Sequence, residues 1–225
     1  MNNNLAIKEY NNHIKDSMPL AVFVFSDKLE QFPQEISTDE GIEKIYHRVV
    51  QDKQITGKPG EAPYIYALDS NFSKFYFIGI GNSSELELEN FRVAGAALCR
   101  RLRKFNINKV TVKFPNIEHE LSNELENRVQ AFIEGFMLRN YDFCKYREKS
   151  HEGAVEELYI FEDNQPRKEI IFRGIRVGEA LSKATNFCRN IANEPANFMT
   201  PEIMAEKATE IAERFNDSLI CKVYN

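Results

Sequence analysis

The feature that most constrains the fold is a series of short apolar runs separated by amphipathic stretches. Leu20–Phe25 and Phe75–Ile80 are continuous apolar runs, as expected for strands that are buried on both faces of a sheet. Further strands are predicted at Tyr64–Leu68, Lys109–Phe114 and Val155–Phe161. Strands that alternate with helices need crossover connections, so the sequence predicts an α/β sandwich with a mostly parallel or mixed sheet.

Three helices are expected between these strands, and a fourth follows them. The first spans about 38–53 behind Ser37–Glu40, which have the spacing of a capping box. The second spans about 85–105, and the third runs from Ser122, the expected cap, to about Asn140. The fourth runs from Pro166 through Ala192 and would be roughly 40 Å long. Its predicted apolar stripe consists of Ile170, Val177, Leu181, Ala184, Cys188 and Ile191.

The segment after this long helix contains a stop signal and a start signal. Glu194 precedes a proline and is disfavoured in helical geometry, so the helix should end near Ala192 or Asn193. Thr200 followed by Pro201 predicts a new helix, with the threonine as its cap. The expected apolar stripe of this helix is Met204, Ala208, Ile211 and Phe215, and a strand is predicted at Leu219–Tyr224.

Composition limits the classes of function. The 225 residues are 43% hydrophobic, which can build a sizeable core, and the net charge of −5 gives no general attraction to nucleic acid or to anionic membranes. No apolar stretch approaches the ~20 residues of a membrane helix, and residues 1–4 do not resemble an export signal. A cytoplasmic protein is therefore expected, and nucleic acid is not expected as a partner.

The cysteines and histidines are too scattered to suggest a metal centre. Cys99, Cys144, Cys188 and Cys221 lie far apart, and all four are predicted to be small buried residues. The histidines, at positions 13, 47, 119 and 151, include no pair with the spacing of a helical zinc motif.

Two local patterns have competing interpretations. Gly79 and Gly81 follow a strand and could cradle a phosphate, but a third glycine at the dinucleotide spacing is missing, so a tight turn is favoured. The cations near the end of the second helix, Arg100, Arg101, Arg103 and Lys104, could complement the exposed helix carbonyls or face an acidic partner; the first interpretation is favoured.

Several motifs together resemble the leucine aminopeptidase (cytosol aminopeptidase) family. The segment Arg189–Glu202 is similar to that family's domain junction, in which Asn-Glu-Pro-x-Asn is followed by two apolar residues and Thr-Pro. Three upstream segments match in the same order: Gly57–Glu61 with Ile78–Gly81, the Gly/Ala-rich Ala94–Ala97, and the aromatic helix end Glu134–Tyr146. The resemblance covers the chain from about residue 17 onward, but only the first half of a family member.

The resemblance implies a three-layer, macro-domain-like α/β sandwich followed by a long interdomain helix. The implied division is an N-terminal domain at 1–163, a linker helix at 164–194 and a truncated start of the catalytic domain at 195–225. The parent enzyme would be a hexameric metallo-exopeptidase that removes N-terminal amino acids from peptides with two divalent ions, zinc, manganese or magnesium. Its metal ligands and catalytic residues lie beyond this segment, so no catalytic, cofactor-binding or metal residue is assigned here, and the chain alone is predicted to be inactive.

Two alternatives from other functional classes remain. The macro-like fold could bind a nucleotide of the ADP-ribose type near Gly79–Gly81, or the chain could be a DNA-binding accessory protein. Binding of ADP-ribose would favour the first, and salt-dependent retention on duplex DNA would favour the second.

Overall fold

The computed structural model describes residues 5–10, 18–36, 40–67, 72–146 and 153–224. Contacts divide the chain into two units, Met1–Lys183 and Ala184–Asn225, and the division falls within one helix. The expected boundaries at 163/164 and 194/195 remain predictions.

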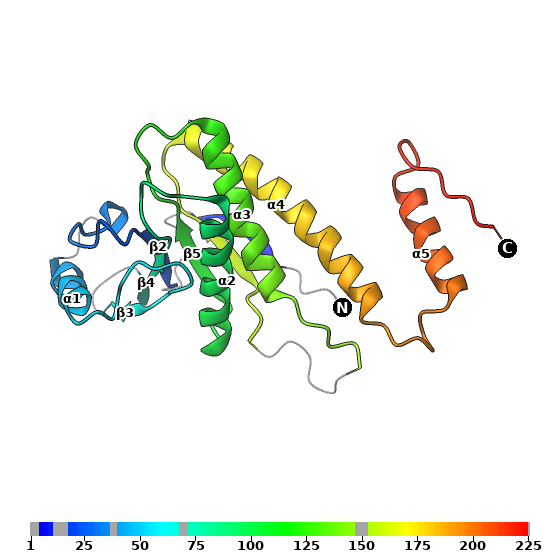
Figure 1. Cartoon of the computed structure of the whole chain (residues 1–225), viewed down its shortest axis with the longest axis horizontal. Helices are drawn as coiled ribbons and strands as arrows, with labels where there is room; N and C mark the ends of the chain where they lie inside the picture. Colours follow the sequence, from blue (N-terminus) through cyan, green and yellow to red (C-terminus); the bar gives the residue numbers. More distant parts are fainter. Residues whose placement is uncertain (1–4, 11–17, 37–39, 68–71, 147–152, 225) are drawn as a thin grey trace. The chain divides into compact units, whose positions relative to one another are not determined.

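The first unit is built on a six-stranded sheet (Figure 1). The order is β1-β6-β5-β2-β4-β3, and all neighbours are parallel except the β3–β4 pair. The strands are β1 Ala6–Glu9, β2 Leu20–Val24, β3 Tyr64–Tyr66, β4 Lys74–Gly79, β5 Lys109–Lys113 and β6 Glu157–Ile160. All five residues of β2 are buried, as its continuous apolar run predicts for a central strand.

Helices cover both faces of the sheet, which confirms the predicted α/β fold with a mostly parallel sheet (Figure 1). The helical elements are the short 3-10 helix η1 Gln34–Ile36 and the α-helices α1 Glu40–Gln51, α2 Leu88–Lys104, α3 Ser122–Asn140, α4 Gln165–Ala192 and α5 Pro201–Arg214. One core contains Val22 and Phe77 of the sheet with Tyr46 of α1. The other contains Phe23 of the sheet with Phe132 of α3 and residues of α2 and α4.

Small residues allow α2 and α3 to pack closely. A Cβ atom at Gly95 of α2 would lie 2.9 Å from the backbone nitrogen of Phe136, and one at Gly135 of α3 would lie 2.7 Å from the carbonyl carbon of Arg92. Arg92 also donates to the Glu134 carboxylate, at 2.9 Å from NH2. The glycines therefore set the separation of the two helices, and an ion pair adds to their contact.

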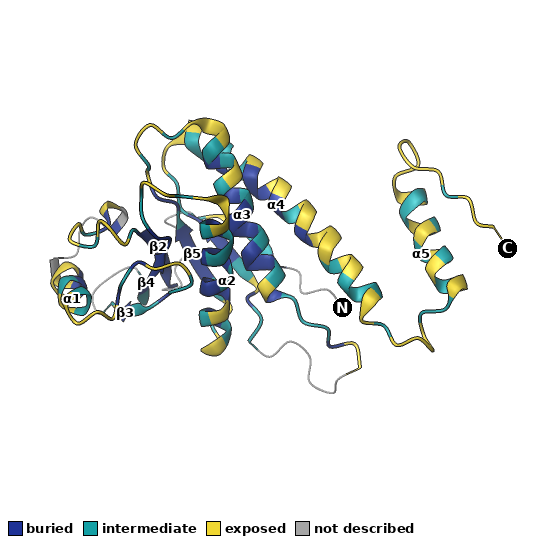
Figure 2. Cartoon of the chain, in the orientation of Figure 1, coloured by how far each residue is buried: buried dark blue, intermediate teal, exposed yellow. Residues whose placement is uncertain are grey.

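The buried face of α4 differs from the predicted stripe. Figure 2 shows α4 buried along one side and exposed along the other. The buried residues are Ile171, Gly174, Ile175, Gly178 and Ser182, whereas Val177 and Leu181 are 41% and 47% exposed and Cys188 is exposed. The predicted stripe followed large apolar side chains, and the prediction that Cys188 is buried was wrong. The glycines instead bring α4 against α3, where a Cβ at Gly174 would lie 3.0 Å from Val129 Cβ.

Ion pairs fix the beginning of α4 to the loop that precedes α3. The Glu120 carboxylate is 96% buried and lies 2.6 Å from Arg128 NH1 and 3.2 Å from Arg167 NH1. Arg167 also pairs with Glu162 and donates to the Pro115 carbonyl. Because Glu120 is shared by two guanidinium groups, its buried charge is compensated.

Several local predictions need correction. β1 was missed, and Leu219–Tyr224 is not a strand. Ser122 is the first residue of α3 rather than its cap; the backbone N–H of Leu121 instead donates to the Glu124 carboxylate. The capping residues Ser37–Asp39 lie outside the described residues. The predicted end of α4 at Ala192 is confirmed.

The second unit contains the last turns of α4 and the helix α5. Thr200 caps α5 as predicted: its Oγ1 accepts from the backbone N–H of Ile203 at 3.4 Å, and Pro201 occupies the first turn. None of the residues of α5 is buried, and Met204 and Phe215 are 44% and 51% exposed. Within the described ranges of both units, no helix is long and apolar enough to cross a membrane.

Candidate functional site

The glycine turn that suggested a phosphate cradle is used for packing. The Gly81 N–H donates to the Gly57 carbonyl at 2.8 Å, the Gly79 N–H donates to the Glu61 carbonyl at 3.0 Å, and the Gly81 carbonyl accepts from Ser26 at 2.9 Å. A Cβ at Gly79 would lie 2.7 Å from the carbonyl carbon of Gly57. Since these backbone N–H groups already have acceptors, the nucleotide-binding alternative at Gly79–Gly81 is not favoured.

The described segments contain no group of three or more His, Cys, Asp or Glu side chains that could hold a metal ion. His47 lies 3.6 Å from the carboxylate of Glu43, whereas His13 and His151 fall outside the described residues. The donor set for a two-metal centre is thus not present in these segments. That the catalytic, cofactor-binding and metal residues lie elsewhere remains a prediction.

All four cysteines were predicted to be buried, and this prediction is correct for two of them. Cys99 and Cys144 are buried, and burial raises the pKa of the Cys99 thiol to about 12. Cys188 is exposed and Cys221 is partly exposed, so they were wrongly predicted to be buried. Only the buried pair acts as the small apolar residues that the sequence suggested.

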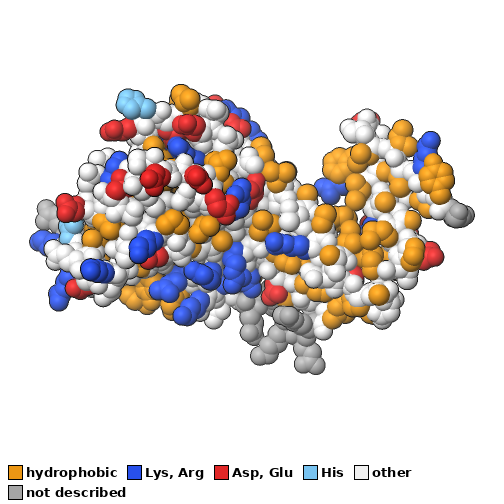
Figure 3. Space-filling view, viewed as in Figure 1, with side chains coloured by type: hydrophobic (Ala, Val, Ile, Leu, Met, Phe, Trp, Pro, Cys, Tyr) orange, Lys and Arg blue, Asp and Glu red, His pale blue; other side chains and the backbone are white. Residues whose placement is uncertain are grey.

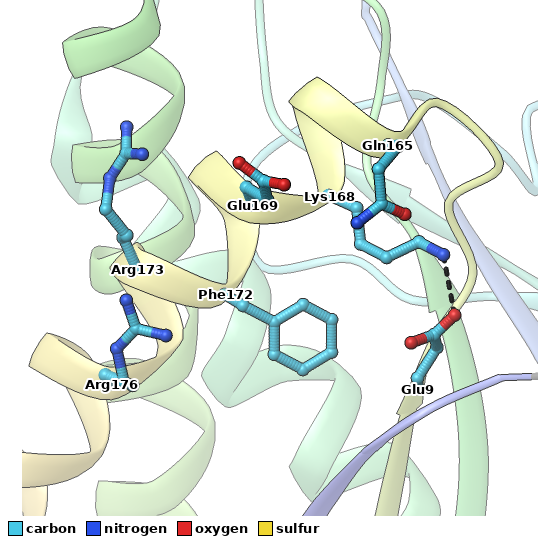
Figure 4. A pocket seen from close by; sticks show the side chains of 7 residues that line it. All are labelled: Glu9, Gln165, Lys168, Glu169, Phe172, Arg173 and Arg176. Carbon is cyan, nitrogen blue, oxygen red and sulfur yellow. Dashed lines mark hydrogen bonds and ion pairs between the residues drawn. The ribbon is translucent and has the colours of Figure 1, made fainter.

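A first hollow lies between β1 and the first half of α4 (Figure 4). Its volume is about 420 Å³, and the ring of Phe172 lies at its centre in this view. The Lys168 ammonium pairs with Glu9 at 2.6 Å, and Arg173 pairs with Glu126 at 3.0 Å. Most of the charge around this β1–α4 hollow is therefore balanced within the protein.

A second hollow lies beside the C-terminal turns of α2. Its volume is about 470 Å³, and its walls are formed by Gln54, Gly60, Glu61, Ala62, Pro63, Ala97, Arg100, Arg101 and Lys104. Figure 3 shows Lys and Arg side chains gathered over this end of α2. We call it the α2 hollow.

The cations at this end of α2 make contacts beyond their own helix. Arg103 donates to the carbonyls of Arg139 and Asn140, at 3.2 and 3.1 Å, and Arg100 donates to the Gly60 carbonyl at 3.0 Å. Arg101 lies over aromatic rings instead. Arg101, Arg103 and Lys104 also lie in the last turn of α2, where positive charge complements the exposed helix carbonyls, as the sequence predicts.

Comparison with known proteins identifies the family. A model of the N-terminal domain of the cytosol aminopeptidase family matches residues 21–150. The chain belongs to this family. A probable cytosol aminopeptidase of Aquifex aeolicus is 31% identical over 208 residues, which are 92% of this chain and 39% of the relative. A probable cytosol aminopeptidase of Alkaliphilus oremlandii is 30% identical over 78% of this chain and 36% of the relative. The chain thus spans about two fifths of these cytosol aminopeptidases.

Solved structures show the same fold. A mutant of tomato leucine aminopeptidase superposes with a TM-score of 0.70, at 19% identity over 95% of this chain and 43% of the tomato chain. The bottromycin maturation enzyme BotP in complex with Mn superposes with a TM-score of 0.65, at 18% identity over 88% of this chain and 37% of that chain. In both, the matching region is a minor part of the longer polypeptide.

Proposed function

We propose that this chain is the N-terminal, non-catalytic portion of a leucyl aminopeptidase-like metallo-exopeptidase that removes N-terminal amino acids from peptides. The observation that carries the proposal is the match of residues 21–150 to the N-terminal domain of the cytosol aminopeptidase family. The relatives extend well beyond the part that aligns with this chain, since the alignment of 208 residues covers 39% of the Aquifex protein. A cytoplasmic location goes with this assignment.

The chemistry would then reside in the other portion of the parent enzyme. Two divalent ions, zinc, manganese or magnesium, would activate a water molecule there for attack on the peptide bond. Manganese is supported by one neighbour in fold, the bottromycin maturation enzyme BotP in complex with Mn. The described residues of this chain offer no cluster of three metal-ligating side chains, so they do not fit such a centre, and no catalytic step is assigned to them.

The role proposed for this portion is assembly of the oligomer, a hexamer in the parent enzyme, and control of access to the active site. The exposed apolar side chains along α4 and α5 support it. Val177, Met204 and Phe215 are each more than 40% exposed, although such residues are more often buried. Covering these side chains would add to the stability of an assembled enzyme.

The proposal can be tested with antibodies raised against residues 18–183. They should deplete a metal-dependent leucyl anilide hydrolase from an extract of the source cells, and the captured polypeptide should exceed 225 residues. The purified 225-residue chain should release no leucine with manganese or zinc present. Hydrolysis that is proportional to this chain and abolished by a chelator would contradict the proposal.

A further inference from the structure

The α2 hollow has the chemistry of an anion site. We propose that it binds a small oxyanion carrying at least two negative charges, a phosphate or polycarboxylate compound, through Arg100, Arg101 and Lys104. This inference rests on the described residues alone and is independent of the proposed peptidase role.

The charge around the hollow is unbalanced. Three cations and one carboxylate, that of Glu61, line it, which gives a net charge of +2. The Glu61 carboxylate accepts from the backbone N–H and the hydroxyl of Thr56, at 3.3 and 2.8 Å. Both hydrogen bonds are made to one oxygen, Oε2, and the carboxylate keeps the negative charge that the sum of +2 includes. The whole chain carries −5, so this excess of positive charge is local.

Arg101 and Lys104 lack anionic partners in the described part of the chain. Neither side chain makes a hydrogen bond or an ion pair within that part, and the Nε atom of Arg101 is buried without an acceptor. A guanidinium group has five N–H donors in a fork that matches carboxylate and phosphate oxygens, and an unmet buried donor carries a desolvation cost. A bound oxyanion would supply acceptors to this fork.

Aromatic rings hold these cations in place. The Arg101 guanidinium lies 5.7 Å from the ring centroid of Tyr64 and 5.3 Å from that of Phe105, and Lys104 Nζ lies 5.9 Å from the Phe105 centroid. Lys74 Nζ lies over Tyr64 and Tyr66, at 5.2 and 4.8 Å. Contact with a ring face stabilises a cation and restricts its movement without neutralising its charge. Arg101 and Lys104 thus contact aromatic rings while their charge stays available to an anion.

The hollow also has suitable size and walls. Its volume of about 470 Å³ falls in the range of small-molecule sites, and Gly60, Ala62, Pro63 and Ala97 leave room beside the cations. The β1–α4 hollow is similar in size, about 420 Å³, but there Lys168 and Arg173 are paired with carboxylates. Because its cations are less fully paired, the α2 hollow is the better candidate for an anion site.

The test uses the 225-residue chain with pyrophosphate and citrate as probes, titrated by calorimetry at constant ionic strength. We expect saturable binding of one probe molecule per chain, with backbone amide shifts at Gly60, Ala62 and Ala97 in NMR spectra. The double variant Arg101→Gln/Lys104→Gln should weaken binding at least tenfold. The tighter of the two probes distinguishes phosphate from carboxylate chemistry.

The matched control is Arg176→Gln/Lys183→Gln, which removes the same two charges from α4. Its affinity should stay within twofold of the parent chain. If the double variant does not fold, Arg101→Lys replaces it in the test. This substitution keeps the positive charge but removes the forked N–H donors of the guanidinium group, and it should weaken binding at least threefold. Absence of saturation, an equal loss in the control, or amide shifts confined to the β1–α4 hollow would overturn the proposal.

Discussion

Gly135 lies directly against Arg92 of the neighbouring helix, where a Cβ atom would be 2.7 Å from the Arg92 carbonyl carbon. Backbone is on the opposing side, so the clash cannot be relieved by a side-chain rotation. Gly135→Ala should therefore lower the free energy of unfolding by about 1–3 kcal/mol, measured by urea titration. Gly41→Ala, at an exposed position of α1, is the control and should leave stability equal or higher. Equal stability of the two variants would contradict this packing.

The two sides of α4 should respond differently to truncation. Ile175 is 3% exposed and Val177 is 41% exposed, although they are two residues apart. Ile175→Ala should cost about 2–5 kcal/mol through lost burial and a cavity, whereas Val177→Ala should change stability by less than about 0.5 kcal/mol in the isolated chain. Urea unfolding of both variants distinguishes this orientation from the stripe that the sequence suggested. The reverse order of effects would show that α4 is rotated.

The Tyr46 hydroxyl is buried without a hydrogen-bond partner among the described residues, and burial raises its pKa from 10.0 to about 12. The folded form therefore disfavours the phenolate. Its contribution to stability is complete below pH 10 and is lost as the pH rises towards 12. Tyr46→Phe removes an unsatisfied polar group and should leave stability at pH 7 equal or up to about 1 kcal/mol higher.

The same substitution should reduce the fall in stability between pH 10 and pH 12. Thermal unfolding of parent and variant across this interval measures the effect. A variant that loses more than 1 kcal/mol at pH 7 would indicate that the hydroxyl has a partner.

Glu157 joins three strands, because Lys8 of β1 and Lys109 of β5 both pair with it, the second at 3.0 Å. The hydrogen bonds from these lysines lower the pKa of Glu157 from 4.5 to about 2. Its contribution is present above pH 4.5 and is lost as the pH falls towards 2. Glu157→Gln should destabilise the chain by roughly 1 kcal/mol at pH 7 and by much less at pH 2.5, whereas the adjacent exposed Glu156→Gln serves as the control. A constant loss at both values would exclude the ionic contribution.

The cysteines should react in two phases with an aromatic disulfide reagent in the folded chain. Exposed Cys188 and partly exposed Cys221 should be labelled first. Cys99 and Cys144 should react only after unfolding, since burial limits access and keeps the Cys99 thiol protonated. Mass spectrometry of quenched samples identifies the labelled peptides. Early modification of Cys99 would contradict the described core.

The sequence predicted the parts of the fold in which local pattern and burial agree. β2 and β4 are long apolar runs, and buried parallel strands require such runs. β1 was not predicted because it has only four residues, two partly buried and two exposed, and so short a segment shows no clear periodicity. Leu219–Tyr224 has strand-forming residues but no paired strand in the described structure, and an isolated strand has no hydrogen-bonding partner.

Only the cationic residues of the candidate site could be predicted from the sequence, not their arrangement in space. Arg100, Arg101 and Lys104 are close in sequence, but the ring of Tyr64 is brought to Arg101 by the pairing of β3 with β4 and the packing of α2. Sequence spacing cannot show that Glu61 is the one carboxylate among the residues that line the α2 hollow. The same limit applied to α4, where glycines rather than large side chains mark the buried face.

The parallel pairing of β1 with β6 has a consequence for synthesis. Ala6 is aligned with Glu157, about 150 positions later in the chain. At roughly 5–20 residues per second, the ribosome delivers the partner strand some 8–30 s after the first strand has been made. The segment Ala6–Glu9 cannot pair with β6 until most of the domain has been synthesised. Completion of this edge of the sheet should therefore be a late event in folding. Such long-range pairing is also the kind that slows folding most.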